Sequence, residues 1–104
     1  LHYFSMVTKG DILDLFGNAY FGLGETLYLQ GKYERAFASF EAALEHLSES
    51  SLCFVLAQLE IGNLQKRWGK YEEAKKAYQT AFERSKDEEI KQAAQELLQL
   101  LESQ

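Results

Sequence analysis

The residues of this chain that could carry out chemistry are few and widely separated. His2 and His46 lie far apart, and no cysteine or carboxylate stands at metal-ligand spacing from either of them. Cys53 is the only cysteine, so the chain can form neither an internal disulfide nor a cysteine-based zinc site. Its neighbours are apolar, which predicts a small buried side chain. We therefore expect no metal site.

The glycines and the acidic residues also lack the arrangements that catalysis needs. Gly17, Gly22 and Gly24 lie among aromatic residues in a stretch with helical spacing, whereas a phosphate-binding loop follows a strand. The 16 acidic side chains are scattered over polar faces, and the pattern pairs none of them as a general acid and a general base. The sequence thus predicts no cofactor and no enzymatic activity.

The composition favours one helical domain. The chain has 104 residues, 46% of them hydrophobic, and contains no proline. This length suffices for a sizeable core, and abundant Leu, Ala, Glu, Gln and Lys favour helices. The net charge of −5 argues against nucleic-acid binding, and no apolar stretch approaches the roughly 20 residues that span a bilayer. We expect a soluble, cytoplasmic, all-α protein that contacts neither nucleic acid nor membrane.

An internal repeat organises the chain. Residues 31–36 (GKYERA) align with residues 69–74 (GKYEEA) at an offset of 38 residues, and the same offset places Gly24 on Gly62 without a gap. Apolar residues recur at three- and four-residue steps on both sides of each turn glycine. Each unit is therefore predicted to be a helical hairpin.

Local signals predict where the helices begin and end. Gly31 and Gly69 can adopt the positive φ that ends a helix, and Ser51 and Asp87 are suited to be N-caps. Trp68, just before the second turn glycine, is expected to cover that turn by packing. The predicted helices are residues 12–30, 33–47, 51–68, 71–86 and 88–102.

The two ends of the chain are predicted to differ from the full repeats. Residues 1–9 look like the end of a preceding repeat's second helix, with residues 9–11 forming the following helix end, turn and N-cap. Residues 88–102 occupy a first-helix position without its glycine, which predicts a capping helix. The predicted organisation is one domain over residues 1–104, cut from a longer protein, with repeats at 12–47 and 51–86.

The two units resemble tetratricopeptide repeats. That motif has a small residue in the first helix, a glycine before the turn, an aromatic residue two positions later, and then alanine, aromatic and alanine along the second helix. The matching residues are Gly24, Gly31, Tyr33, Ala36, Phe40 and Ala43 in the first unit and Gly62, Gly69, Tyr71, Ala74, Tyr78 and Ala81 in the second. The period of 38 residues exceeds the usual value of about 34, and Ser48 and Lys86 replace a frequent proline.

The resemblance implies an α-α superhelix, a right-handed solenoid of stacked hairpins. The first helices of the repeats would line a concave groove that binds a peptide or helix of a partner protein, so the implied function is a non-catalytic scaffold. The groove positions carried over from the family are Asn18, Phe21, Glu25, Tyr28 and Leu29 in the first repeat and Leu56, Leu59, Asn63, Lys66 and Arg67 in the second. Phe21 and Tyr28 are expected to be exposed, whereas Leu56 and Leu59 either line the groove or belong to the core.

Other functions stay open at this point. The chain is alternatively a regulatory or sensor module of a multidomain signalling or transcription regulator. It is alternatively a self-association module, because Leu1, Tyr3, Phe4 and Met6 would leave an apolar edge open to a second copy in a homodimer. Asn63 matches the asparagine with which some family members grip a terminal carboxylate. Phe21 or Leu59 stands where such a clamp needs a lysine, so that activity is not expected.

Overall fold

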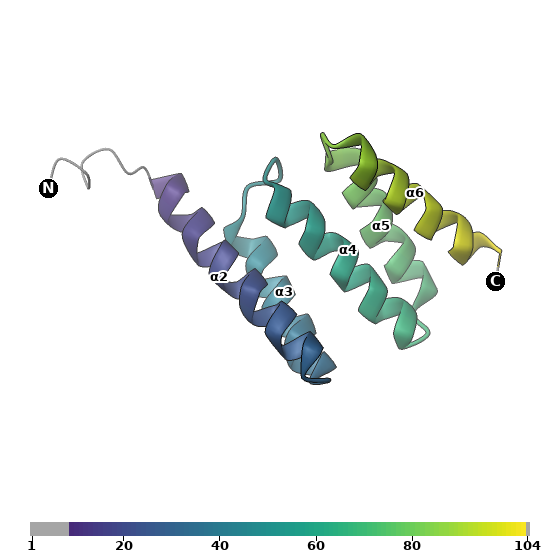
Figure 1. Ribbon diagram of the computed structural model, residues 1–104, viewed down its shortest axis with the longest axis horizontal. Helices are drawn as coiled ribbons and strands as arrows, with labels where there is room; N and C mark the ends of the chain where they lie inside the picture. The colour runs from purple at the N-terminus through teal and green to yellow at the C-terminus, as the bar shows by residue number, and fades with distance from the viewer. Residues whose placement is uncertain (1–8, 104) are drawn as a thin grey trace, which may run out of the picture.

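A computed structural model describes residues 9–103 of the chain, which form five α-helices and no strand (Figure 1). The all-α prediction is therefore confirmed. The helices are α2 (Lys9–Leu29), α3 (Tyr33–His46), α4 (Leu52–Arg67), α5 (Tyr71–Arg84) and α6 (Glu88–Glu102).

The observed helix boundaries agree with the predicted ones to within two residues, except at the start of α2. The predicted turn and N-cap over residues 9–11 are wrong, because the backbone is already helical at Lys9. A glycine costs a helix only about 1 kcal/mol relative to alanine, so Gly10 alone does not end one. The end of a preceding repeat's helix was predicted over residues 1–9; residues 1–8 lie outside the described residues, and Lys9 belongs to α2.

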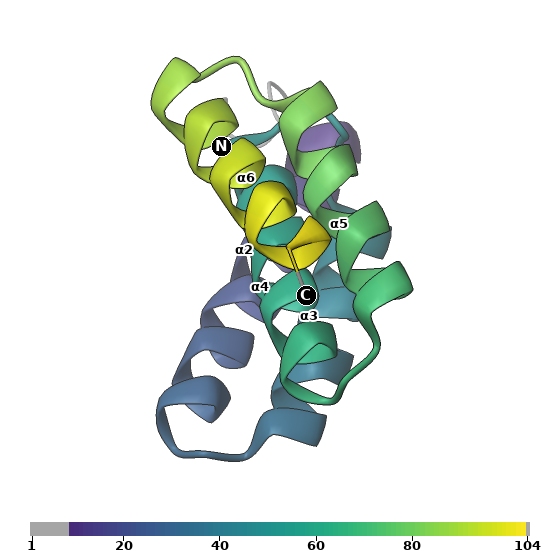
Figure 2. The same cartoon turned by 90° about the vertical axis from the view of Figure 1, so that its right-hand side faces the viewer.

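The helices are arranged in two layers. Helices α2, α4 and α6 form one layer and α3 and α5 form the other, so each hairpin contributes one helix to each layer (Figures 1 and 2). Helix α2 packs against α3 and α4 packs against α5, while α3 also contacts α4 and α5 contacts α6. Hairpins thus follow one another along a molecule of 55 × 30 × 18 Å, as expected for a helical repeat.

Both turns have the geometry that the sequence predicts. Gly31 and Gly69 have φ values of 79° and 77°, a left-handed conformation that favours glycine. Beyond each glycine, the backbone N–H of Lys32 donates to Leu27 O at 2.9 Å and that of Lys70 to Gln65 O at 2.8 Å. These bonds satisfy carbonyl groups that the helix ends leave free.

The two predicted N-caps are confirmed. The Ser51 side chain accepts a hydrogen bond from the Phe54 N–H at 3.0 Å at the start of α4. Asp87 Oδ1 accepts one from the Glu89 N–H at 2.9 Å at the start of α6. Each cap satisfies a backbone donor that has no partner within its helix.

Each hairpin is closed by an aromatic ring that packs against a glycine. Phe40 and Tyr78 are fully buried. A Cβ atom added to Gly24 would lie 2.7 Å from Phe40 Cδ1, and one added to Gly62 would lie 2.5 Å from Tyr78 Cε1. The rings therefore occupy the space that any larger residue would need, which explains the small-against-large pattern of the repeat.

Candidate functional site

The ten predicted groove residues come from α2 and α4, neighbouring helices of one layer. Nine of them are at least partly exposed, and we call the surface they form the α2/α4 face. Its exposed residues are Asn18, Glu25, Leu29 and Arg67, and its half-buried residues are Tyr28, Leu56, Leu59, Asn63 and Lys66.

Phe21 does not belong to this face. It was predicted to be exposed, but its side chain is only 9% exposed and its ring lies 5.6 Å from that of Phe40, centroid to centroid. Because Gly24 lacks a side chain, Phe40 comes close to α2, and Phe21 packs in the same core cluster. Phe21 therefore stabilises the first hairpin and is removed from the candidate site.

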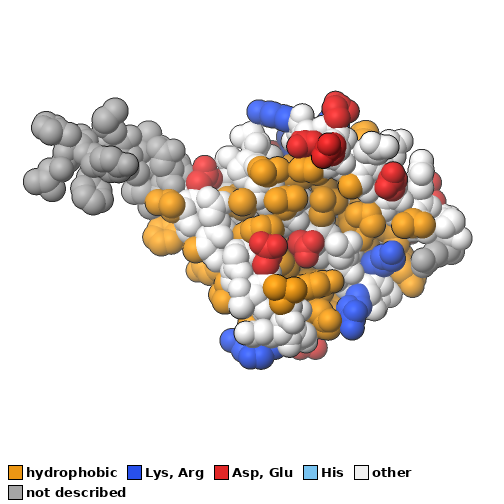
Figure 3. All heavy atoms as spheres, viewed as in Figure 1, with side chains coloured by type: hydrophobic (Ala, Val, Ile, Leu, Met, Phe, Trp, Pro, Cys, Tyr) orange, Lys and Arg blue, Asp and Glu red, His pale blue; other side chains and the backbone are white. Residues whose placement is uncertain are grey.

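The apolar part of the α2/α4 face is only partly covered by the protein. Leu56 packs against the core cluster shared by the two hairpins, and Leu59 against the two clusters that α4 and α5 form with α6. Both leucines nevertheless keep part of their surface in solvent, so each contributes to the core and to the face. Figure 3 shows apolar side chains spread over this side of the molecule, with acidic side chains among them near its middle.

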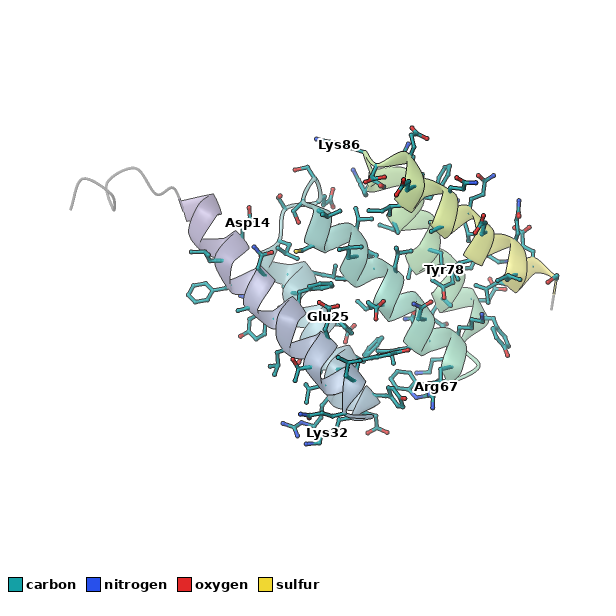
Figure 4. The ribbon with its side chains drawn as sticks, viewed as in Figure 1. Asp14, Glu25, Lys32, Arg67, Tyr78 and Lys86 are labelled. Atoms are coloured by element: carbon teal, nitrogen blue, oxygen red, sulfur yellow. The ribbon has the colours of Figure 1, made fainter. Side chains whose placement is uncertain are left out.

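A polar cluster lies at the middle of the α2/α4 face. The fully buried Tyr78 donates its hydroxyl proton to Asn63 Oδ1 at 2.5 Å. Glu60 precedes Asn63 by about one helical turn on α4, and the Glu25 carboxylate on α2 lies close enough to act on Glu60 electrostatically. Figure 4 labels Glu25 in the space between α2 and α4.

The pKa values in this cluster follow from its burial. Burial raises the pKa of the Glu60 carboxyl and the nearby Glu25 carboxylate adds to the rise, whereas the hydrogen bond with Asn63 lowers it. Burial, Glu60 and Tyr28 together raise the pKa of Tyr78 to about 12. The Tyr78 phenol is thus protonated at neutral pH and donates to Asn63 Oδ1, and this bond does not use the Asn63 NH₂ group.

The prediction of groove residues did not include Glu60 and Tyr78. Glu60 lies three residues before Asn63 and therefore on the same side of α4, which is a signal that the sequence contains. Tyr78 could be found from the repeat offset, since it occupies the position of Phe40 in the second repeat and adds one hydroxyl group there.

Aromatic and basic residues border the α2/α4 face at its turn end. The rings of Tyr28 and Tyr33 pack edge to face with centroids 5.3 Å apart, and the Arg67 guanidinium lies 4.2 Å from the centre of the Tyr33 ring. Trp68 packs edge to face on Phe37 of the first hairpin with ring centroids 5.5 Å apart, and 37% of it stays exposed. This end of the face is therefore fixed by contacts between the first and second hairpins.

The groups that could support other chemistry are not placed for it. The Cys53 thiol has its pKa raised, chiefly by burial and also by Glu25 and Asp14, which opposes formation of the reactive thiolate. Within residues 9–103, no group of three or more His, Cys, Asp or Glu side chains could hold a metal ion. In the same part of the chain, no helix has both the length and the apolar character needed to cross a bilayer.

Successive helical hairpins, closed by glycine–aromatic contacts and carrying a partly apolar face, define a helical-repeat protein. The tetratricopeptide repeat family matches residues 15–87, and the chain belongs to this family. Its members are generally scaffolds for protein–protein interaction and bind protein partners, and they are typically non-catalytic. A search of curated proteins found no significant match to the chain.

Proposed function

We propose that this chain is a non-catalytic interaction module that binds a peptide or helix of a partner protein on the α2/α4 face. The observation that carries the proposal is the incomplete burial of apolar side chains on that face. Leu29 is 86% exposed, and Leu56 and Leu59 are half-buried around a polar centre. Burying such leucines supplies affinity, while the polar groups between them set the register of the bound segment. Membership of a family of interaction scaffolds supports a protein partner.

The experiment that tests this function uses a display library of random 12-residue peptides, selected on the immobilised chain. Leu29→Gln is expected to raise the dissociation constant of the selected peptides about tenfold, because burial of one leucine is worth roughly 1.5–3 kcal/mol. Ala38→Gln is the matched control, since Ala38 is exposed on α3 in the other layer. Equal effects of the two substitutions on the dissociation constant would contradict binding at the α2/α4 face.

Self-association is a second candidate, favoured by a different surface of α2. Phe16 and Leu23 are 53% and 48% exposed, whereas the residues at the same repeat positions in α4, Phe54 and Ile61, are 7% and 5% exposed. Helix α3 packs beside α4, and no helix among the described residues covers the corresponding side of α2. A second copy of the chain could bury this apolar side of α2.

Light scattering over a range of concentrations tests self-association. If the second candidate is right, the wild-type chain will have the mass of a dimer and the Phe16→Gln, Leu23→Gln double variant that of a monomer. A monomeric wild-type chain throughout the range would exclude the dimer. Phe21 is unsuitable for such a test, because its substitution would disturb the core.

A further inference from the structure

We propose that the α2/α4 face selects partner segments that carry a lysine or arginine between apolar residues, with the cation held by Glu25 and Glu60. This inference rests on the proposed function, because it specifies the chemistry of the segment that the face binds. Three observations support it. The two carboxylates lie on neighbouring helices, Glu60 is flanked by leucines, and the first repeat has no carboxylate at the position of Glu60.

The two carboxylates belong to neighbouring helices of one layer, and the charge of Glu25 acts on Glu60. Glu25 extends from α2 into the space between α2 and α4, and Glu60 belongs to α4. The one salt bridge within the described residues joins Arg84 to Glu49, so neither carboxylate of the pair has a basic partner there. A cation placed between the two helices would interact with both charges at once.

The surroundings of Glu60 favour a cation with an apolar stem. Glu60 is half-buried on the same helix as the half-buried Leu56 and Leu59. Lysine and arginine carry their charge on a long aliphatic chain, which can pack on leucine while its end reaches a carboxylate. Asn63 lies about one helical turn after Glu60 on α4, and the Tyr78 hydroxyl is bonded to its Oδ1. A partner's cation at Glu60 would therefore lie beside an amide group whose position Tyr78 sets.

The fold does not require a carboxylate at position 60. Under the 38-residue offset, Gly22 occupies the same place in the first repeat, and that glycine has nothing within 4 Å of where its side chain would be. A half-buried carboxylate near a second negative charge is also unfavourable for stability, because Glu60 loses hydration and the two charges repel one another. A positive charge on a bound partner would offset this repulsion, so the pair would favour binding of a basic residue.

The ends of the face differ in charge, which gives the bound segment a direction. Lys66 and Arg67 follow Glu60 by about two helical turns, or roughly 9–10 Å along α4. A segment with its basic residue at Glu25 and Glu60 would place an acidic residue beside Lys66 in one orientation only. A carboxylate clamp holds an acidic group with basic residues, whereas here acidic residues would hold a basic group. The apolar Phe21 or Leu59 stands where such a clamp needs a lysine.

The test compares the peptides selected from the random 12-residue library by the wild-type chain and by the Glu25→Gln, Glu60→Gln double variant. The wild-type chain is expected to enrich lysine or arginine flanked by apolar residues, and the double variant is expected to lose that enrichment. The strongest wild-type peptide should bind the double variant about tenfold more weakly. Replacing the peptide's basic residue with glutamine should have the same effect on wild-type binding and no effect on binding to the double variant.

The control variant is Glu34→Gln, Glu72→Gln, which changes the net charge equally at exposed positions in the layer formed by α3 and α5. It should bind the wild-type peptide within twofold of the wild-type chain. The Glu25→Gln, Glu60→Gln variant should melt at or above the wild-type temperature, which separates lost binding from lost folding. Wild-type selection without basic enrichment would overturn this inference and leave the interaction function standing. A library that yields no binding peptide would contradict both.

Discussion

Truncating Phe40 to alanine is expected to lower the free energy of unfolding by about 3–5 kcal/mol. The ring is fully buried, fills the space above Gly24 and packs against Phe21 with centroids 5.6 Å apart. Its removal leaves a cavity between α2 and α3 that neither helix can fill without moving. Because small domains are stable by only about 5–15 kcal/mol, a loss of this size would leave the chain close to unfolding.

Phe16→Ala provides the matched control, because Phe16 is also a phenylalanine of the first hairpin but is largely exposed. Its truncation should cost less than about 1 kcal/mol. Urea denaturation followed by circular dichroism at 222 nm measures both values on the same scale. Similar losses for the two variants would show that burial against Gly24 does not account for the importance of Phe40.

The second large effect is expected from Gly24→Ala, which should destabilise the chain by about 1–3 kcal/mol. The added Cβ would lie 2.7 Å from the Phe40 ring, which is closed in on all sides and cannot turn away. The same substitution at Gly22, two residues earlier in α2, meets open space and should stabilise the chain by up to about 1 kcal/mol. Helix propensity favours alanine over glycine at both positions. A loss of stability at Gly24 together with a gain at Gly22 would therefore be due to the contact with Phe40.

Thermal denaturation of the Gly24→Ala and Gly22→Ala variants measures this difference in stability. Repeating Gly24→Ala in a Phe40→Leu variant tests whether the Phe40 ring is its cause. In a Phe40→Leu background the smaller side chain leaves room for a Cβ on α2, so Gly24→Ala should cost less there than in the wild-type chain. An equal cost in both backgrounds would mean that Phe40 is not the neighbour that excludes alanine.

The hairpins could be predicted from sequence because their signals are local and occur twice. A turn glycine with positive φ and a polar N-cap each act within a few residues. The small residue that faces an aromatic ring lies on the other helix of the hairpin, but the pair recurs at the repeat offset. The start of α2 was predicted incorrectly because Gly10 carries the same local signal as Gly31. The tertiary surroundings of a glycine decide whether it ends a helix, and these are absent from the local sequence.

The candidate site was less predictable because exposure depends on neighbouring helices. Helix α2 carries large apolar residues on several sides, so its periodicity does not distinguish the buried Phe21 from the exposed Phe16. Glu60 could not be found by transferring groove positions, since its counterpart Gly22 is not one of them. Its environment is created by the Asn63–Tyr78 hydrogen bond, which joins residues 15 positions apart on two helices.

The hairpins share a core between α3 and α4, and further contacts join them at both ends of α3. At the turn end Trp68 packs on Phe37 and Arg67 on Tyr33, and at the other end Arg84 is paired with Glu49 in the loop after α3. Because α3 and α4 carry more of the contact between the hairpins than α2 and α4 do, a change at the α3–α4 contact is expected to alter the separation of α2 and α4. A substitution at Trp68 would then change the proposed binding of a cation without altering either carboxylate.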